Sequence, residues 1–116
     1  MKDIKTLLKL CNVGPHLLGY YVLEYLIERV ANKFRNKNYN IAYGKLLREY
    51  AEAHNTTYAR AERAARHAIT YAFAQPNEWH RRLFKNTVYR TVTPQLSLFV
   101  ATLAEFLNED NIDEEK

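Results

Sequence analysis

The helical organisation of this chain is most evident in residues 55–69, whose sequence is NTTYARAERAARHAI. At about 100° per residue, this stretch and the residues just after it form a helix with two different faces. One face consists of small residues with an isoleucine at its edge: Ala61, Ala65, Ala68, Ile69 and Ala72. The opposite face is basic and polar: Arg60, Arg63, Arg66, His67 and Thr70. The small face predicts close packing against another helix, with the basic row pointing outward.

A second helix is predicted just before this one, separated from it by a short turn. It covers residues 41–54, with Asn40 as its N-cap. Its inner face is formed by Leu46, Leu47 and Tyr50, with Ala51 where two crossing helices would approach. Asn55 tolerates the left-handed conformation that ends a helix. Thr57 or Thr56 can then accept a hydrogen bond as the N-cap of the following helix.

Helix, turn and helix together span about residues 41–74 and have the pattern of a helix-turn-helix. In that motif the second helix enters the major groove of DNA, and an arginine-rich outer face suits this role. The turn position that usually holds glycine is Asn55 here. The alternative is an ordinary amphipathic helix with a solvated basic surface, because alanine favours helices in any setting.

The composition is that of one helical globular domain. The chain has 116 residues, of which 47% are hydrophobic, and it contains nine Tyr, five Phe and one Trp. Three Gly, three Pro and the absence of alternating Val/Ile/Thr runs argue against hairpins and strands. We expect a single compact all-α domain of about six helices over residues 1–107. Residues 108–116 are expected to form an acidic, flexible tail.

The charge of the chain is divided unevenly along its length. Residues 1–104 hold sixteen Lys and Arg against seven Asp and Glu, a net charge of +9. Residues 105–116 hold six acidic residues and one Lys, a net charge of −5. A basic body suits a polyanionic partner such as double-stranded DNA. The acidic end is expected to be solvated, and a less favoured alternative is that it competes with DNA for the basic face.

A long helix is predicted from His16 to Phe34, because Pro15 suits the first helical position. Its apolar residues recur mainly every four positions: Leu18, Tyr21, Val22, Tyr25, Leu26, Val30 and Phe34. These residues are expected to face the core. The polar residues 35–38 form the connector to the next helix.

Two more helices are predicted in the second half of the chain. The shorter one begins at Asn77 and carries Trp79, Leu83 and Phe84. The last one has Thr93 as its N-cap and Pro94 as its first residue. Its apolar face comprises Leu96, Phe99, Val100, Leu103, Phe106 and Leu107. The stretch 87–92 is ambiguous and fits either an extended segment or a loose turn.

Several classes of function are not indicated. Cys11 is the only cysteine, so an internal disulfide is excluded and a cytoplasmic location is expected. The sequence has no apolar run long enough to span a membrane and no signal-peptide pattern. Four scattered histidines and one cysteine do not have metal-ligand spacing. Without a nucleophile or phosphate-loop motif, we expect no enzyme activity, no metal and no cofactor.

Four short motifs carry a family resemblance that covers about residues 13–107. They are Gly14 to Tyr20 (GPHLLGY); Asn55-Thr56-Thr57 with Glu62-Arg63-Ala64 and Arg66-His67-Ala68-Ile69; Leu83-Phe84 with Thr87-Val88; and Pro94, Ser97 and Phe99-Val100-Ala101. In these motifs the chain resembles the C-terminal DNA-binding effector domain of the stage-zero sporulation master regulator of endospore-forming Firmicutes. The resemblance implies a six-helix domain whose helix-turn-helix recognises a short promoter box in the major groove. It also implies protomers in tandem or as a dimer on DNA, and contact with RNA polymerase sigma factors.

The resemblance and the chemistry of the side chains together suggest DNA contacts. Base contacts are expected from Arg60, Glu62 and Arg63, since Arg can donate to guanine and Glu can accept from cytosine. DNA backbone contacts are expected from Thr56, Thr57, Arg66, His67 and Lys85. The alternative for Glu62 is an i,i+4 ion pair with Arg66.

The chain departs from the family pattern in three respects. It is too short to include the regulator's phosphoacceptor receiver domain, so it is expected to be either a stand-alone relative, which its start at Met1 favours, or a fragment. His54 occupies a position where the family prefers an apolar residue, and Thr93 replaces a basic one. The main function predicted is sequence-specific DNA binding in transcription regulation. The alternatives are a protein-interaction module that keeps the fold, and binding of nucleic acid through charge alone.

Overall fold

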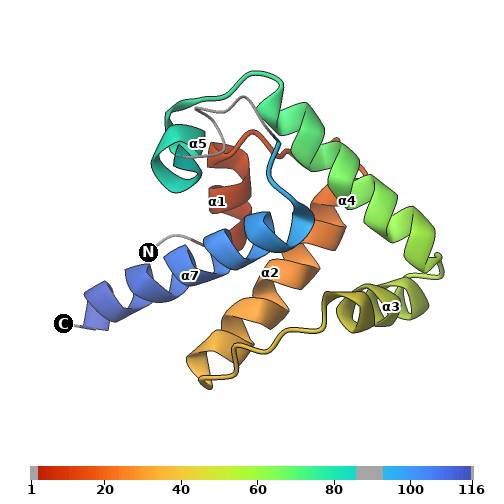
Figure 1. Cartoon of the computed structure of the whole chain (residues 1–116), viewed down its shortest axis with the longest axis horizontal. Coiled ribbons are helices and arrows are strands. Elements are labelled where there is room, and N and C mark those ends of the chain that lie inside the picture. The colour runs from red at the N-terminus through yellow and green to blue at the C-terminus, as the bar shows by residue number, and fades with distance from the viewer. Residues whose placement is uncertain (1–2, 86–92, 116) are drawn as a thin grey trace.

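The computed structural model describes residues 3–85 and 93–115, with side chains as far as Glu109, and this part contains six helices and no strand. In chain order they are α1 (Ile4–Leu10), α2 (Gly19–Arg35), α3 (Tyr43–Ala53), α4 (Tyr58–Phe73), α5 (Glu78–Leu83) and α7 (Leu96–Glu115) (Figure 1). The predicted all-α class and the number of helices are confirmed. The ambiguous stretch 87–92 lies outside the described residues.

Helix α2 is the central element of the fold (Figure 1). It contacts α1, α3, α4 and α7, and its most extensive contact is with α7. Its most buried side chains include Leu23, Leu26, Ile27 and Val30, each 0% exposed. They join Phe99, Leu103 and other apolar residues of α7 in one core. Because α2 is covered on several sides, its buried surface is wider than a single stripe.

A close backbone contact occurs where α2 crosses α4. A Cβ atom added to Gly19 would overlap the carbonyl oxygen of Ala64 and would lie 2.9 Å from the Cα of Ala65. The predicted alanine stripe on α4 is buried here, with Ala61 and Ala65 at 2% and 0% exposure. Small side chains on both helices therefore let the two backbones approach each other.

The predicted start of the long helix was wrong. Residues 15–18 form turns, and α2 begins at Gly19, so Pro15 is not its first residue. Leu18 and Tyr21 were expected in the core, but they are 87% and 52% exposed. For Leu18 the four-residue spacing was misleading because this residue is the N-cap of α2 and lies outside the helix to which the spacing was applied.

Two other predicted helix starts were also wrong. Asn40 is not the N-cap of α3, because the helix begins at Tyr43 and Ala42 occupies the N-cap position. The Asn40 N–H instead donates to Asn38 Oδ1 in the connector. Helix α7 begins at Leu96, after the predicted Thr93 cap and Pro94 start. Its first turn instead includes a hydrogen bond from the Phe99 N–H to the Gln95 carbonyl, at 2.9 Å.

The last helix extends beyond its predicted end. We expected the helical domain to end near Leu107, whereas the backbone of α7 is helical as far as Glu115. The segment after Leu107 contains neither Gly nor Pro, the residues that most often stop a helix. The boundary of the acidic segment therefore does not coincide with a helix end.

A buried histidine connects α1, α4 and α5. His80 is 0% exposed, and its Nε2 donates to the Cys11 carbonyl at 2.7 Å. Its Nδ1 accepts from the Asn77 N–H at 3.3 Å, while Asn77 Oδ1 accepts from the His80 N–H, so Asn77, predicted as the first residue of α5, is its N-cap. The ring stacks on Phe73 with 3.9 Å between centroids. Both ring nitrogens are satisfied only when the imidazole is neutral.

We expect Gly19→Ala to destabilise the fold by roughly 1–3 kcal/mol or more, because the added methyl group meets backbone atoms that cannot move aside easily. Gly44→Ala is the matched control, since its Cβ would have no neighbour closer than 3.8 Å. In a helix that change should be neutral or slightly stabilising. Urea unfolding of both variants measures the difference, and equal stabilities would contradict the close crossing.

The stability of the fold should fall in acid partly through His80. Burial lowers the pKa of His80 below its ordinary value. Because its pKa is lower in the folded state, His80 contributes fully to stability at pH values above its pKa in the unfolded chain. This contribution is lost as the pH falls through the folded-state pKa. His80→Leu should cost about 1–3 kcal/mol at pH 7.5 by leaving buried groups unpaired, and should weaken the dependence on pH.

Urea unfolding at pH 7.5 and pH 5 measures both effects, with His67→Gln as a control for an exposed histidine. If wild type and His80→Leu lost the same amount of stability from pH 7.5 to pH 5, the proposed role of His80 would be contradicted.

Candidate nucleic-acid interface

Helices α3 and α4 are joined by a short turn over residues 54–57, as the sequence predicted. Asn55 has φ of 52°, the left-handed conformation expected of it. Thr57, rather than Thr56, caps α4, and its Oγ1 accepts from the Arg60 N–H at 3.2 Å. The Thr56 N–H donates to the Ala51 carbonyl at 2.9 Å, which closes the end of α3. The arrangement is consistent with a helix-turn-helix.

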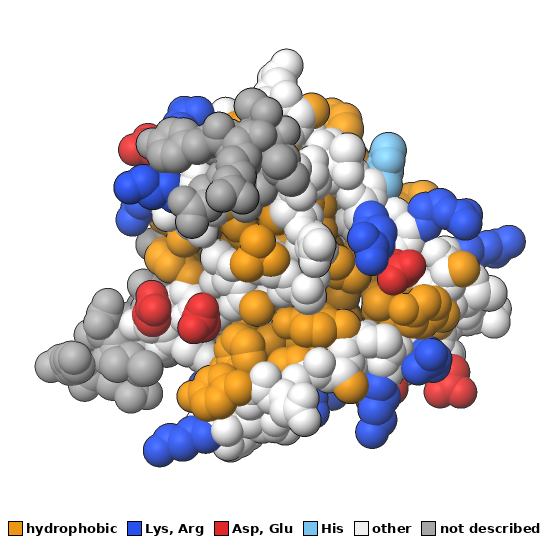
Figure 2. Space-filling model, in the orientation of Figure 1, with side chains coloured by type: hydrophobic (Ala, Val, Ile, Leu, Met, Phe, Trp, Pro, Cys, Tyr) orange, Lys and Arg blue, Asp and Glu red, His pale blue; other side chains and the backbone are white. Residues whose placement is uncertain are grey.

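The outer face of α4 is basic and open to solvent. Arg60, Arg63, Arg66, His67 and Thr70 are all exposed, as predicted, while the alanine stripe is buried beneath them. Figure 2 shows blue Lys and Arg side chains gathered over α3 and α4, with few red carboxylates among them. Such a surface attracts a polyanion and keeps its donors available.

Arg63 occupies the middle of this exposed face. At about 100° per residue it lies roughly 140–180° around the helix from each of the four buried alanines. Arg60 and His67 lie on one side of it, and both line a groove of about 670 Å³ between α2, α3 and α4. Arg66 lies on the other side, toward Glu62.

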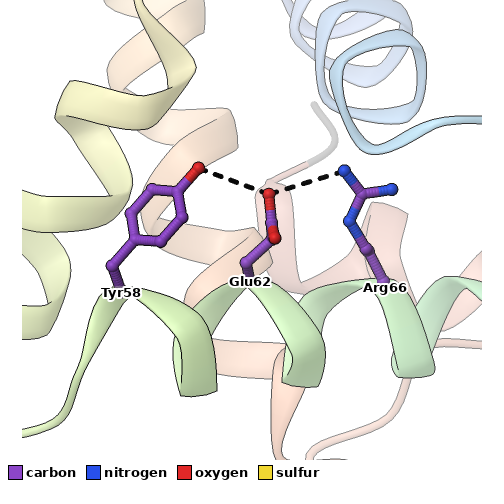
Figure 3. A network of polar contacts seen from close by, with 3 residues as sticks. All are labelled: Tyr58, Glu62 and Arg66. Atoms are coloured by element: carbon purple, nitrogen blue, oxygen red, sulfur yellow. Dashed lines mark hydrogen bonds and ion pairs between the residues drawn. The ribbon is translucent and has the colours of Figure 1, made fainter.

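Glu62 has the i,i+4 ion pair that sequence reasoning offered as an alternative. Its Oε2 lies 3.5 Å from Arg66 Nη2 and also accepts from the Tyr58 hydroxyl at 3.3 Å (Figure 3). The Glu62 side chain is 31% exposed and that of Arg66 57%, so both also face solvent. The pair adjoins a hollow of about 280 Å³ between α3, α4 and the start of α7.

The predicted backbone-contact residues are not all in one place. Thr56 and Thr57 lie in the turn before α4, and Arg66 and His67 lie along its outer face. Lys85 is exposed but follows α5, which lies at the opposite end of α4 from the α3–α4 turn (Figure 1). The structure therefore separates Lys85 from the other residues of the predicted set.

The structure adds residues that the sequence analysis did not assign to this surface. His16, Leu18 and His54 line the same groove as Arg60 and Arg63. Their proximity depends on how α2 and α3 pack against α4, so no spacing in the sequence indicated it. Tyr58 and Arg48 were also missed: the Arg48 guanidinium carbon lies 5.2 Å from the centre of the Tyr58 ring. In the sequence, the i,i+4 spacing of Tyr58 and Glu62 was the one feature that could have indicated their contact.

Other chemistry has little support in the described part of the chain. No group of three or more His, Cys, Asp or Glu side chains is placed to hold a metal ion among residues 3–85 and 93–109. Within the described helices, none is long and apolar enough to cross a membrane. Burial raises the pKa of the Cys11 thiol to about 12, so this thiol is poorly suited to act as a nucleophile.

Comparison with known families gives a match over nearly the whole domain. The family model for the C-terminal part of sporulation initiation factor Spo0A matches residues 4–107 of the 116 residues. The match runs from the first residue of α1 to Leu107 in α7, and it includes both α3 and α4. It confirms the resemblance found in the sequence motifs. The family consists of DNA-binding effector domains of a sporulation regulator, and this chain belongs to it.

Proposed function

We propose that this protein is a sequence-specific DNA-binding transcription regulator that recognises a short box by placing α4 in the major groove. One observation carries the proposal: the exposed face of α4 presents three arginines above a buried stripe of alanines. The helix can therefore pack closely against α2 while its long arginine side chains remain available to donate hydrogen bonds to DNA. Membership of the Spo0A C-terminal family supports DNA binding independently.

Arg60, Glu62 and Arg63 are the proposed base contacts. Arg63 is central on the exposed face, and its guanidinium can donate two hydrogen bonds to the O6 and N7 of guanine. Arg60 is within the first turn of α4, and the N-terminal residues of a recognition helix are those that usually contact base edges. Glu62 supplies an acceptor, which suits the N4 amino group of cytosine.

Thr56, Thr57, Arg66, His67 and Lys85 are the proposed contacts to the DNA backbone. The Thr57 hydroxyl accepts from the Arg60 N–H, and it keeps its own proton to donate to a phosphate oxygen. Arg66 uses Nη2 toward Glu62, but the rest of its guanidinium is available, since the side chain is 57% exposed. Contacts of this kind fix the register of the helix on DNA without selecting a base.

The family resemblance also suggests an assembly and a cellular setting. We propose that protomers occupy neighbouring boxes in tandem or as a dimer, and that the domain contacts an RNA polymerase sigma factor in the cytoplasm. Neither step requires a metal, a cofactor or a catalytic residue. The basic body of the chain favours association with DNA through its overall field as well as through single contacts.

Selection from a random duplex library at physiological salt tests the proposal, using wild type and Arg63→Ala in parallel. Wild type should enrich a short motif. Arg63→Ala should weaken binding to that motif by about 1–3 kcal/mol and reduce the base preference at one position of the motif, because a base-specific donor is lost. Lys5→Ala, which removes a positive charge from an exposed position in α1, should leave the motif intact.

Enrichment of no motif by well-folded wild type would overturn the proposal. Binding that falls equally with salt for every sequence would indicate attraction through charge alone. A stoichiometric protein complex without DNA binding would instead indicate an interaction module.

A further inference from the structure

Among the described residues, both partners of the Glu62 carboxylate on α4 contact the same one of its two oxygens. Glu62 Oε2 accepts from the Tyr58 hydroxyl at 3.3 Å and lies 3.5 Å from Arg66 Nη2. The three side chains follow one another at single-turn intervals along α4, with Glu62 in the middle (Figure 3). The donor on each side fixes the direction of the carboxylate along the helix.

Neither contact uses Glu62 Oε1. Because the side chain is 31% exposed, that oxygen can accept a hydrogen bond from outside the protein. In the major groove, the donor that suits a carboxylate is the N4 amino group of cytosine. The other major-groove donor is the N6 amino group of adenine. Adenine also presents an acceptor there, N7, and a carboxylate has no proton to donate to it.

The tyrosine that holds Glu62 is itself held by the preceding helix. Tyr58 is the first residue of α4, and the Arg48 guanidinium of α3 lies over its ring. The Tyr58 hydroxyl also lies near Gly44, since a Cβ added there would be 3.9 Å from that oxygen. Both helices of the proposed helix-turn-helix therefore contribute to the position of one carboxylate.

This arrangement has consequences for binding. A free glutamate on a helix surface samples several rotamers, and ordering it on DNA reduces affinity. Contacts made before binding remove part of that cost. The positive charge of Arg66 also offsets the repulsion between a carboxylate and nearby phosphates. A glutamate with these partners is better suited to a base contact than an unsupported one.

We propose that Tyr58 is a specificity-determining positioning residue, which holds Glu62 by Oε2 so that Oε1 accepts a hydrogen bond from a cytosine in the target box. The inference rests on the proposed function of α4 as a recognition helix. Tyr58 does not contact the base in this arrangement. It acts through Glu62.

Tyr58→Phe tests the proposal, because it removes only the hydroxyl and keeps the ring beneath Arg48. In the library selection, this variant should lose about tenfold of its preference for cytosine at one position. Other positions and the salt dependence should be unchanged, and the thermal midpoint should stay close to that of wild type. Tyr71→Phe is the matched control, since Tyr71 is an exposed tyrosine on the same helix whose change should leave every preference intact.

A double variant distinguishes positioning from an independent effect. Glu62→Ala should lose the same cytosine preference, and Tyr58→Phe combined with Glu62→Ala should lose no more than Glu62→Ala alone. Additive losses in the double variant would overturn the proposal.

The other outcomes separate this inference from the proposed function. Unchanged preferences in Tyr58→Phe, or an equal loss at every position, would overturn the role of Tyr58 while leaving α4 as the recognition helix. Failure of wild type to select any motif would overturn both.

Discussion

The close crossing of α2 and α4 is the constraint on which the rest of the structure depends. Gly19 lies against the backbone of Ala64 and Ala65, where any side chain would force the helices apart. Because the buried face of α4 consists of alanines near this crossing, its backbone lies close to α2 there, while Ile69 and Phe73 anchor the C-terminal half of the helix in the core. Its arginines then face outward, and Leu18, just before α2, lies beside Arg60 and Arg63.

The charge on α4 is organised by contacts within the helix as well as by its overall sign. An isolated glutamate among arginines would oppose the approach of a polyanion. Here Tyr58 and Arg66 engage one oxygen of Glu62, and Arg48 connects this group to α3. At the other end of α4, the buried imidazole of His80 stacks on Phe73. A polar cluster thus lies at the N-terminal end of the helix that presents the basic face, and an aromatic stack lies at its C-terminal end.

The errors in the sequence predictions have a common origin. Pro15, Asn40 and Thr93 are each suitable for a helix start, yet none is used, and the helices begin three or four residues after them. The preference of a residue for a capping position is a local property, whereas the residue at which a helix begins also depends on how its first turn packs against other helices. The start predicted at Asn77 was accurate to one residue, and there the side chain has partners in two elements, the His80 N–H and the Leu10 carbonyl.

The sequence by itself determined the all-α class, the buried and basic faces of α4, and the turn at Asn55 and Thr57. These features depend on residues a few positions apart, so helical periodicity and local backbone preference suffice to predict them. Only the tertiary structure decided the exposure of Leu18, the burial of His80 and the groove beside α4. Periodicity indicates which residues share a face of one helix, but it carries no information about which other helix covers that face.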